Sequence, residues 1–450
     1  MKVVGIDIGT TTITVSLIDG KSGSVIHSLT ARNDANIKTP NAYEHLQDPA
    51  VILKKTMDLL QELIQKGMPD AIGITGQMHG ILYIDAAGDA VSPFYTWRDM
   101  RSDRIYKDGE TYTEHLSRMT GVRLAAGFGS ATHFYNTVSR LVPKGSVRLC
   151  TIHGYVAMKL CGRTEPLIHD SDAASFGLFD IHSGRFMRDC ISSVGMDASF
   201  FPEVTSGFTE LGRTKAGTPV FVAIGDNQAS FIGSVRDMKN SVLVNVGTGS
   251  QVSLFSDVPL EDISMEIRPS LGGYLVVGSS LCGGYAYAVL ERFFRDVVIM
   301  AGFECGNLYQ AMDALSEGYR NLKDKLEVST AFTGTRENPG LRGSVRNLST
   351  ENFTPRHFVI GVLDGIVREL YDKYSGIKDK LLRQREIIVG SGNGIRKSAV
   401  MRQMFAEIFG MDMVVPSHTE EAAYGAALFA LVGAGFCDSL ETAQKIIRYC

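Results

Sequence analysis

The chain has 450 residues, of which 44% are hydrophobic and 21% charged, and its formal net charge at pH 7 is −4. This length predicts two large domains, while the slight negative charge excludes a basic surface for nucleic acid and the short apolar runs exclude a membrane span. The seven cysteines include no C-x-x-C pair, which indicates reduced thiols and a cytoplasmic protein. From the charge and the apolar runs we expect no binding to nucleic acid or membrane.

The first predicted element is a hairpin at the N terminus. An apolar run leads into Asp7, Gly9, Thr10 and Thr11, and a second β-prone run follows. The turn offers backbone N–H groups and hydroxyls, which suits it to holding phosphate oxygens. A single turn of this kind is more often a plain hairpin, so its interpretation depends on other features of the chain.

The second predicted element is a helix that begins at Asp48, its N-cap, has Pro49 in the first turn and ends at Gly67. Its apolar stripe is expected at Leu53, Met57, Leu60 and Ile64. A buried strand over residues 71–75 follows and ends in the loop 76–80. Strands and helices alternate along the chain, which predicts an α/β fold.

The chemical centre is predicted at Asp226. Residues 220–224 have the pattern of a buried strand, and residues 228–235 begin a helix. The carboxylate is therefore expected at the carboxyl end of a strand, where open α/β sheets bind their ligands. An aspartate at such a junction is usually an N-cap, and only the neighbouring motifs favour a chemical role.

A second hairpin repeats the first. An apolar run precedes Asn245, Gly247, Thr248 and Gly249, in the register of the N-terminal turn. The repeat indicates an old domain duplication, with one ligand cleft between the copies and a polyphosphate held from both sides. Between two such turns, Asp226 is suited to accept the proton of an attacking hydroxyl.

Later segments complete the predicted order. A long helix is expected over residues 358–382, and a strand over 386–389 leads into a glycine turn at 390–394. That turn lacks the third glycine and the acid of a dinucleotide fingerprint, yet it suits a nucleotide base or ribose. Two domains are predicted, over 1–225 and 226–450, because the opening motif restarts near residue 241.

Together these motifs resemble, in order and spacing, the FGGY family of carbohydrate kinases over essentially the whole chain. The segments that carry the resemblance are 5–11, 225–227, 245–249, 390–392 and 422–427. The resemblance implies two ribonuclease H-like domains of the actin-like ATPase fold with a central cleft, the first binding the sugar and the second ATP. Two departures concern the adenosine side: Ser391 stands where many members have glycine, and residues 334–339 match the family's linker only loosely.

The resemblance also implies roles for single residues. Asp226 is expected to be the catalytic base, and it is also expected to contact the sugar and, with Asp7, the Mg²⁺ ion. The predicted ATP contacts are Gly9, Thr10, Thr11, Gly247, Thr248, Gly249, Gly392 and Asn393.

Two segments resemble the sugar contacts of ketose kinases: Gln77, Met78 and His79, and Trp97, Arg98 and Asp99. An aromatic ring can cover the C–H face of a sugar, while Arg and Asp can bind neighbouring hydroxyls. The stretches 127–132, 151–156 and 171–175 resemble sedoheptulokinases more than xylulokinases or glycerol kinases. A lone tryptophan is nevertheless more often part of a core than a ligand platform.

The expected function is ATP-dependent phosphorylation of the terminal hydroxyl of a ketose, with sedoheptulose as the leading substrate. Closure of the domains over bound sugar is expected to exclude water as a competing acceptor. One alternative is a kinase for xylulose, ribulose or another polyol, and another is a non-catalytic actin-like ATPase or sugar-sensing protein. A monomer or homodimer is expected.

Overall fold

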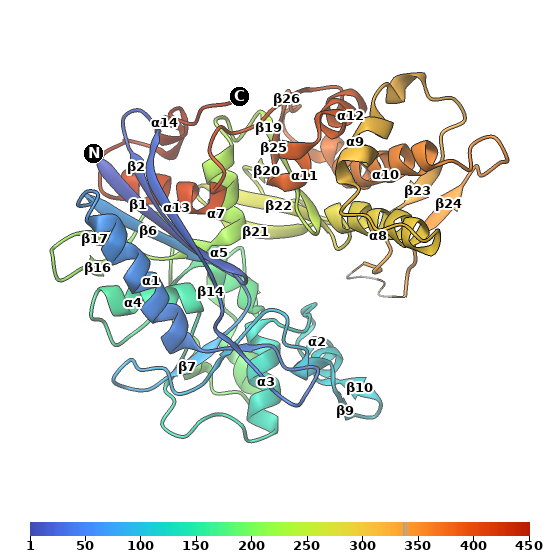
Figure 1. Ribbon diagram of the computed structural model, residues 1–450. Coiled ribbons are helices and arrows are strands. Elements are labelled where there is room, and N and C mark those ends of the chain that lie inside the picture. Colours follow the sequence, from blue (N-terminus) through green and yellow to red (C-terminus); the bar gives the residue numbers. More distant parts are fainter. Residues whose placement is uncertain (336–337, 339) are drawn as a thin grey trace. The chain divides into compact units, whose positions relative to one another are not determined.

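The computed structural model describes residues 1–335, 338 and 340–450, which form two compact units (Figure 1). Unit 1 comprises Met1–Arg236, Arg268–Gly272 and Glu420–Ile447. Unit 2 comprises Asp237–Ile267, Gly273–Thr419 and Arg448–Cys450. A search of the described part of the chain finds no helix with the length and apolar character of a membrane span.

The compact units differ from the predicted division after residue 225. Helix α7 (Asp226–Ser234) belongs to unit 1, and so does α13 (Glu421–Gly433), which comes from near the C terminus. The two helices meet backbone to backbone, since a Cβ atom at Gly425 would lie 1.8 Å from the carbonyl oxygen of Ala229. This contact brings the C-terminal segment into unit 1.

Unit 1 is built on a mixed sheet with the order β16-β17-β6-β1-β2-β3. Strands β1, β2 and β3 are successively antiparallel, whereas β6 is parallel to β1 and β17, and the short β18 is also parallel to β6. Their bounds are β1 Lys2–Ile8, β2 Thr12–Asp19, β3 Val25–Arg32, β6 Ala71–Gly76, β16 Glu210–Arg213, β17 Pro219–Phe221 and β18 Ile224–Gly225.

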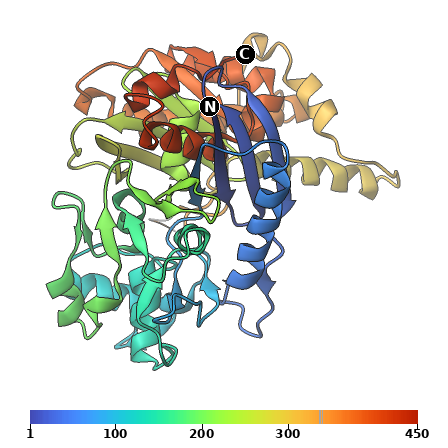
Figure 2. The ribbon, with the colours of Figure 1, turned by 90° about the vertical axis from the view of Figure 1, so that its left-hand side faces the viewer.

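The two faces of this sheet carry different helices because successive residues of a strand point to opposite sides. Val4, Ile6 and Ile8 of β1 share a buried core with α1 (Pro49–Ile64). Gly5 faces α13 instead, where a Cβ atom would lie 1.7 Å from the carbonyl oxygen of Ala423. In Figures 1 and 2, α1 and α13 accordingly lie on the two sides of the dark blue strands.

Unit 2 repeats this plan with the strand order β22-β20-β19-β25-β26. Strands β19, β20 and β22 are successively antiparallel, and β25 is parallel to β19 and β26. Their bounds are β19 Ser241–Val246, β20 Ser250–Ser256, β22 Gly273–Ser280, β25 Ile387–Ser391 and β26 Asp412–Val414. The common order and strand directions agree with the predicted duplication.

The helix predicted to begin at Asp48 is confirmed, but its buried side differs from the prediction. The carboxylate of Asp48 accepts hydrogen bonds from the backbone N–H groups of Ala50 and Val51, and Pro49 is the first helical residue. The buried side chains are Ile52, Thr56, Leu60 and Leu63, whereas Met57 is 42% exposed. Thr56 can be buried because its hydroxyl donates to the carbonyl oxygen of Ile52.

The long helix of unit 2 also has bounds other than those predicted. Helix α10 spans Pro355–Ser375 rather than 358–382. It begins earlier because Thr354 caps the backbone N–H of His357 and a proline follows at the first position. Gly376 forms its C-cap, and only a short 3₁₀ turn follows over Lys378–Lys380.

The remaining elements are shorter. In unit 1 the helices are α2 Tyr112–Thr120, α3 Gly129–Val138, α4 Ile152–Leu160, α5 Asp170–Ala173, α6 Arg188–Ser193 and α14 Leu440–Gln444. Its small strands are β4 Asn36–Ile37, β5 Leu46–Gln47, β7 Leu82–Ile84, β8 Phe94–Tyr95, β9 Ile105–Lys107, β10 Glu110–Thr111, β11 Arg148–Cys150, β12 Leu167–His169, β13 Phe179–Asp180, β14 Arg185–Phe186 and β15 Glu203–Thr205. Unit 2 adds α8 Gly284–Met300, α9 Tyr309–Ser316, α11 Gly392–Lys397, α12 Ala399–Phe409, β23 Glu327–Ser329 and β24 Ser344–Arg346, and β21 Glu266–Ser270 precedes β22 in the chain.

The close contact between α13 and α7 predicts a specific weakness. Gly425→Ala should lower the free energy of unfolding by about 2 kcal/mol or more, although alanine favours helices, because its methyl group overlaps a backbone carbonyl. The measurement is the urea midpoint followed by circular dichroism. Gly306→Ala is the control, since a Cβ atom there meets open space. Equal midpoints for the two variants would contradict the packing described.

Candidate active site

Asp226 is the first residue of α7 and directly follows β18. Gly225 occupies the N-cap position and no side chain caps the helix, so the carboxylate of Asp226 is free of the capping role considered from sequence. Its Oδ1 accepts a hydrogen bond of 3.0 Å from the amide of Asn227. Burial raises the pKa of Asp226 to about 6, although Arg268 and His153 oppose this rise. At neutral pH the group is therefore ionised and can accept a proton.

Asp7 lies close to this group through the register of the sheet. On one side of β6, Asp7 pairs with Thr75, and on the other side Ile224 pairs with the same Thr75. Asp226 therefore follows two positions later along the parallel strand. Both carboxylates thus lie near the carboxyl ends of strands that flank β6, as expected for a ligand site in an α/β sheet.

The surroundings of Asp7 suit a cation. Its Oδ1 is buried and has no hydrogen-bond partner. Burial raises the pKa of Asp7 to about 8, and the negative charges of Asp226 and Glu420 add to the rise. Within the described residues no cluster of three or more His, Cys, Asp or Glu side chains could hold a metal alone. Mg²⁺ typically takes one or two carboxylates together with phosphate oxygens and water, so this donor set fits a metal that arrives with a nucleotide.

The first predicted phosphate turn is present as a tight β1–β2 connection. The N–H of Gly9 donates to the carbonyl oxygen of Thr12 over 2.9 Å, and the amide of Asn33 donates to the carbonyl oxygen of Gly9 over 2.8 Å. The side chains of Thr11 and Thr12 are exposed at the tip. Hydrogen bonds at Gly9 therefore fix the base of the turn, while the side chains at its tip stay accessible.

The second turn, in unit 2, has the same form. The N–H of Gly247 donates to the carbonyl oxygen of Gly249 over 2.9 Å, and Thr248 is exposed. Gly392 adopts a φ of 84° beside it, and a Cβ atom there would lie 2.6 Å from the carbonyl oxygen of Val246. Only glycine fits that position without strain.

Ser391, the departure from the family pattern, has an ordinary extended backbone with a φ of −136°. Its hydroxyl accepts a hydrogen bond of 3.1 Å from the amide of Asn245. The serine therefore leaves the glycine turn intact and also fixes the side chain that stands at the position of Asp7 in the second sheet.

A cavity of about 420 Å³ opens next to this second turn, within unit 2. Gly247, Thr248 and Asn393, three of the residues predicted to contact ATP, line it, whereas Gly249 and Gly392 are not among its lining residues. Tyr287 and Tyr309 add two roughly parallel rings with centroids 6.0 Å apart, and the hydroxyl of Tyr287 donates to Asp313. The sequence analysis missed these three residues because they lie on α8 and α9, outside any recognisable motif. Of the loosely matched run 334–339, residues 336, 337 and 339 lie outside the described part of the chain.

The predicted sugar loop follows β6. Gln77 and Met78 are buried, whereas His79 is partly exposed and has a φ of 71°, which is uncommon for a residue with a side chain. Ser175 holds His79 by two hydrogen bonds, of 3.0 Å to its N–H and 2.9 Å to its ring. The ring also stacks on Phe128 with centroids 4.6 Å apart. The loop is thus fixed in one conformation before any ligand binds.

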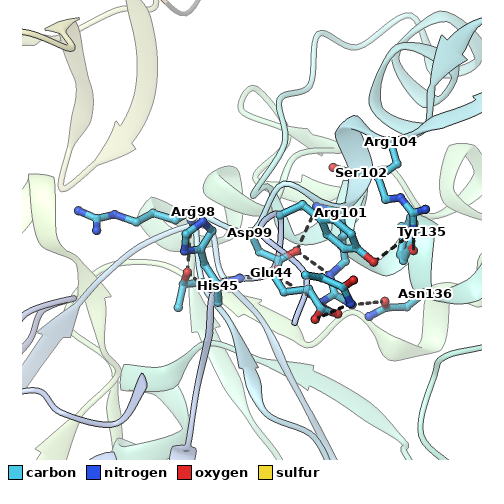
Figure 3. Close-up of polar contacts among 12 residues, drawn as sticks. Glu44, His45, Arg98, Asp99, Arg101, Ser102, Arg104, Tyr135 and Asn136 are labelled. Carbon is cyan, nitrogen blue, oxygen red and sulfur yellow. Dashed lines mark hydrogen bonds and ion pairs between the residues drawn. The ribbon is translucent and has the colours of Figure 1, made fainter. Parts of the chain in front are cut away.

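The segment from Trp97 to Asp99 divides into two parts. Trp97 and Arg98 are exposed, with the guanidinium 5.0 Å from the indole ring, so the only tryptophan is not a core residue. Asp99 is fully buried and binds Arg101 at 2.6 Å and 3.2 Å, and Figure 3 shows Arg98 pointing away from this pair. In place of the predicted sugar contact, the geometry gives Asp99 a supporting role.

Sequence reasoning also missed the buried groups behind these loops. Arg101 donates to Asn136 over 3.0 Å and lies 3.7 Å from Glu44, which ties the Trp97 segment to α3 (Figure 3). The ring of His153 lies 2.5 Å from Asp172, with both side chains almost completely buried. No spacing in the sequence reveals these pairs, because the partners lie on separate helical segments that only the tertiary fold brings together.

Comparison with known proteins agrees with this geometry. Residues 2–243 match the FGGY family of carbohydrate kinases, N-terminal domain, and residues 242–434 match the C-terminal domain of the same family. The chain is 27% identical to sedoheptulokinase of Mus musculus, covering 95% of this chain and 97% of the relative. It is 24% identical to xylulose kinase of Bacillus subtilis (strain 168), covering 99% and 91%.

Solved structures give the same picture of the fold. Ligand-bound xylulose kinase from Lactobacillus acidophilus has a TM-score of 0.85 at 20% identity, covering 100% of this chain and 92% of that chain. Plasmodium falciparum glycerol kinase with ADP has a TM-score of 0.83 at 18% identity, covering 98% and 91%. These similarities confirm the predicted two-domain α/β fold of the actin-like ATPase type.

The enclosure of Asp7 predicts that its charge destabilises the ligand-free protein. An acid whose pKa is raised from 3.8 to about 8 loses its stabilising contribution as the pH rises through that interval. Asp7→Asn should therefore unfold at a higher temperature than the wild type at pH 8, by about 3 °C or more, and the difference should shrink towards pH 4. Thermal unfolding without Mg²⁺ or nucleotide measures this. An equal or lower unfolding temperature for the variant would refute the predicted destabilisation; Asn245→Asp, the reverse change in unit 2, is the control and should lower it.

Proposed function

This chain belongs to the FGGY family of carbohydrate kinases, which are phosphotransferases that act on sugar hydroxyls, and on that premise we propose that it phosphorylates the terminal hydroxyl of sedoheptulose with ATP. The observation that carries the proposal is the carboxylate of Asp226, which follows β18 without capping α7 and lies within electrostatic reach of Asp7. One ionised base beside a cation-binding carboxylate is the minimum that such a transfer requires.

In the proposed reaction, Asp226 accepts the proton of the sugar hydroxyl as its oxygen attacks the terminal phosphorus of ATP. The O–H bond breaks, an O–P bond forms, and ADP leaves with the electron pair of the broken P–O bond. Asp7 would hold Mg²⁺, which neutralises the phosphate oxygens when it is bound. The predicted participation of Asp226 in metal binding stays a prediction.

The nucleotide would occupy the 420 Å³ cavity of unit 2. Thr248 offers an exposed hydroxyl to phosphates at one end, next to Gly247, which has no side chain to keep them away. Tyr309 and the hydroxyl-binding carboxylate of Asp313 suit a base and a ribose farther along. The corresponding polar turn of unit 1, with Gly9, Thr10 and Thr11, stays a predicted phosphate contact.

Sedoheptulose is favoured over other ketoses by two observations. Sedoheptulokinases of Mus musculus and Homo sapiens match 95% of the chain at 27% and 26% identity, above the 24% of the xylulose kinase of Bacillus subtilis. The stretches 127–132, 151–156 and 171–175 resemble the same subgroup, and they include Phe128 and Ser175, which hold His79. Xylulose and ribulose stay as alternatives, and a non-catalytic actin-like ATPase is the alternative of another class.

A substrate panel tests the sugar. We expect ADP formation with the highest kcat/KM for sedoheptulose among sedoheptulose, xylulose, ribulose and glycerol, each compared with a reaction without sugar. A higher value for xylulose would replace the proposed sugar and keep the kinase. ADP formation at the same rate with and without each of these sugars would instead favour the non-catalytic alternative.

Substitution of the base tests the chemistry. Asp226→Asn keeps the shape of the side chain and removes the proton acceptor, so kcat should fall by about 10²- to 10⁴-fold while the affinity for ATP is retained. Steady-state kinetics and calorimetric titration with a non-hydrolysable ATP analogue measure the two quantities. Asp58→Asn, an exposed aspartate of α1 paired with Lys54, is the matched control. Unchanged turnover in the Asp226 variant would show that another group is the base.

A further inference from the structure

Three residues of unit 1, Thr10, Gln77 and Gln47, form a closed ring of hydrogen bonds, and Trp97 donates a further hydrogen bond to Thr10; we call the four residues together the Thr10 ring. Trp97 Nε1 donates to Thr10 Oγ1 over 3.0 Å, and Thr10 Oγ1 donates to Gln77 Oε1 over 3.2 Å. Gln77 Nε2 donates to Gln47 Oε1 over 2.8 Å, and Gln47 Nε2 donates back to the carbonyl oxygen of Thr10 over 3.0 Å. The ring joins groups predicted for two different substrates.

The ring is rigid on one side and open on the other. Gln47 and Gln77 are 0% and 2% exposed, so the surrounding protein holds both amide groups in place. Trp97 is 38% exposed, and Thr10 is partly exposed in the turn. Because Gln47 binds the amide nitrogen of Gln77, the amide oxygen of Gln77 stays directed at Thr10. A ligand can therefore approach Thr10 and Gln77 only from the open side.

The hydroxyl of Thr10 has one proton, and this limits what it can bind. A threonine hydroxyl donates once and accepts twice. In the Thr10 ring the proton goes to Gln77, while one lone pair accepts the N–H of Trp97. A phosphate oxygen at neutral pH only accepts hydrogen bonds. Thr10 can therefore bind a phosphate through its hydroxyl only if that proton turns away from Gln77.

The amide oxygen of Gln77 has the complementary limit. It is the acceptor of the sugar loop that faces Thr10, and a sugar hydroxyl can donate to it. This oxygen has two lone pairs, and a sugar hydroxyl that donates to one of them weakens the hydrogen bond that Thr10 donates to the other. A phosphate that takes the proton of Thr10 likewise leaves the oxygen of Gln77 a stronger acceptor for the sugar. Each substrate thus weakens the hydrogen bond that hinders the other.

We propose that the hydroxyl of Thr10 couples the two substrates, so that sugar bound at Gln77 strengthens binding of the terminal phosphate of ATP at Thr10, and the reverse. The inference rests on the proposed function, since it needs a sugar at the loop of Gln77. Coupling of this kind is reciprocal: the factor by which sugar raises nucleotide affinity equals the factor by which nucleotide raises sugar affinity. Without sugar, the hydroxyl of Thr10 keeps its proton directed at the oxygen of Gln77 and binds the phosphate less well. This disfavours transfer of the phosphoryl group to water.

The chain supplies its own reporter for the test. Trp97 is the only tryptophan in the sequence and is a member of the Thr10 ring. Its fluorescence therefore reports sugar binding directly. Nucleotide affinity is measured by calorimetry with the β,γ-imido analogue of ATP and Mg²⁺, with and without the sugar that gives turnover. The two titrations give the coupling factor from both directions.

Threonine variants separate the hydroxyl from the shape of the side chain. The wild type and Thr10→Ser, which keeps the hydroxyl, should show a coupling factor of about 5-fold or more. Thr10→Val, which keeps the shape, and Thr10→Ala should both reduce the factor to about 1, whatever they do to each separate affinity. Thr56→Val is the matched control, because Thr56 donates only within α1, and its factor should equal that of the wild type.

The outcomes separate this inference from the proposed function. A wild-type factor of 1, or a wild-type factor retained in both Thr10→Val and Thr10→Ala, would overturn the coupling role of Thr10 while leaving the kinase intact. Absence of sugar-dependent ADP formation in the wild type would overturn the proposed function and the inference with it. Loss of coupling in Thr56→Val as well would assign the effect to general loss of packing and so overturn the role of Thr10.

Discussion

The candidate site depends on two carboxylates held near the carboxyl ends of strands that flank β6, where burial disfavours their charged forms. Asp7 lies near the end of β1 and Asp226 follows β18; both strands pair with β6, and burial raises the pKa of each carboxyl group. A fold that only had to be stable would place an amide at one of these positions, as unit 2 does with Asn245. On the proposed function, these unfavourable charges are retained because a cation and a proton acceptor both need them. Gly5 allows α13 to pack closely against β1, the strand that carries Asp7.

The duplicated sheets show how the same frame serves two purposes. Asp7 and Asn245 occupy equivalent positions, each paired across to the parallel strand on its side. The amide of Asn245 donates a hydrogen bond to the hydroxyl of Ser391, whereas the buried Oδ1 of Asp7 has no hydrogen-bond partner in the protein. A group satisfied within the protein contributes to stability, and a group left unsatisfied is available to a ligand. The exchange of one amide for a carboxylate therefore distinguishes a position that binds within the protein from one that is available to a ligand.

Local sequence signals predicted those features whose physics is local. The hairpin turns, the N-cap at Asp48 and the strand before the sugar loop each depend on a few adjacent residues, and the structure has them. The predicted buried side of α1 was wrong by one position for most of its residues. Thr56, whose hydroxyl donates within the helix, is buried where Met57 was predicted, and Met57 is exposed. The pairs Arg101 with Asn136 and His153 with Asp172 were not predictable, since they depend on how separate helical segments meet. The return of α13 to unit 1 was missed for the same reason.

The segments that carry the predicted ligand contacts leave the common sheet at different places in the two units. In unit 1 the long insertion follows β6 and spans residues 77–218, and it carries the sugar loop, Trp97 and the turn of Ser175. In unit 2 the long insertion follows β22 instead, over residues 281–386, and carries Tyr287 and its neighbours in the nucleotide cavity. Since β6 corresponds to β25 and β22 to β3, the two insertions leave the sheet at different corners. The repeated frame thus supplies two turns of similar form, and on the proposed function the ligand of each turn depends on a connection that is far longer than its counterpart in the other unit.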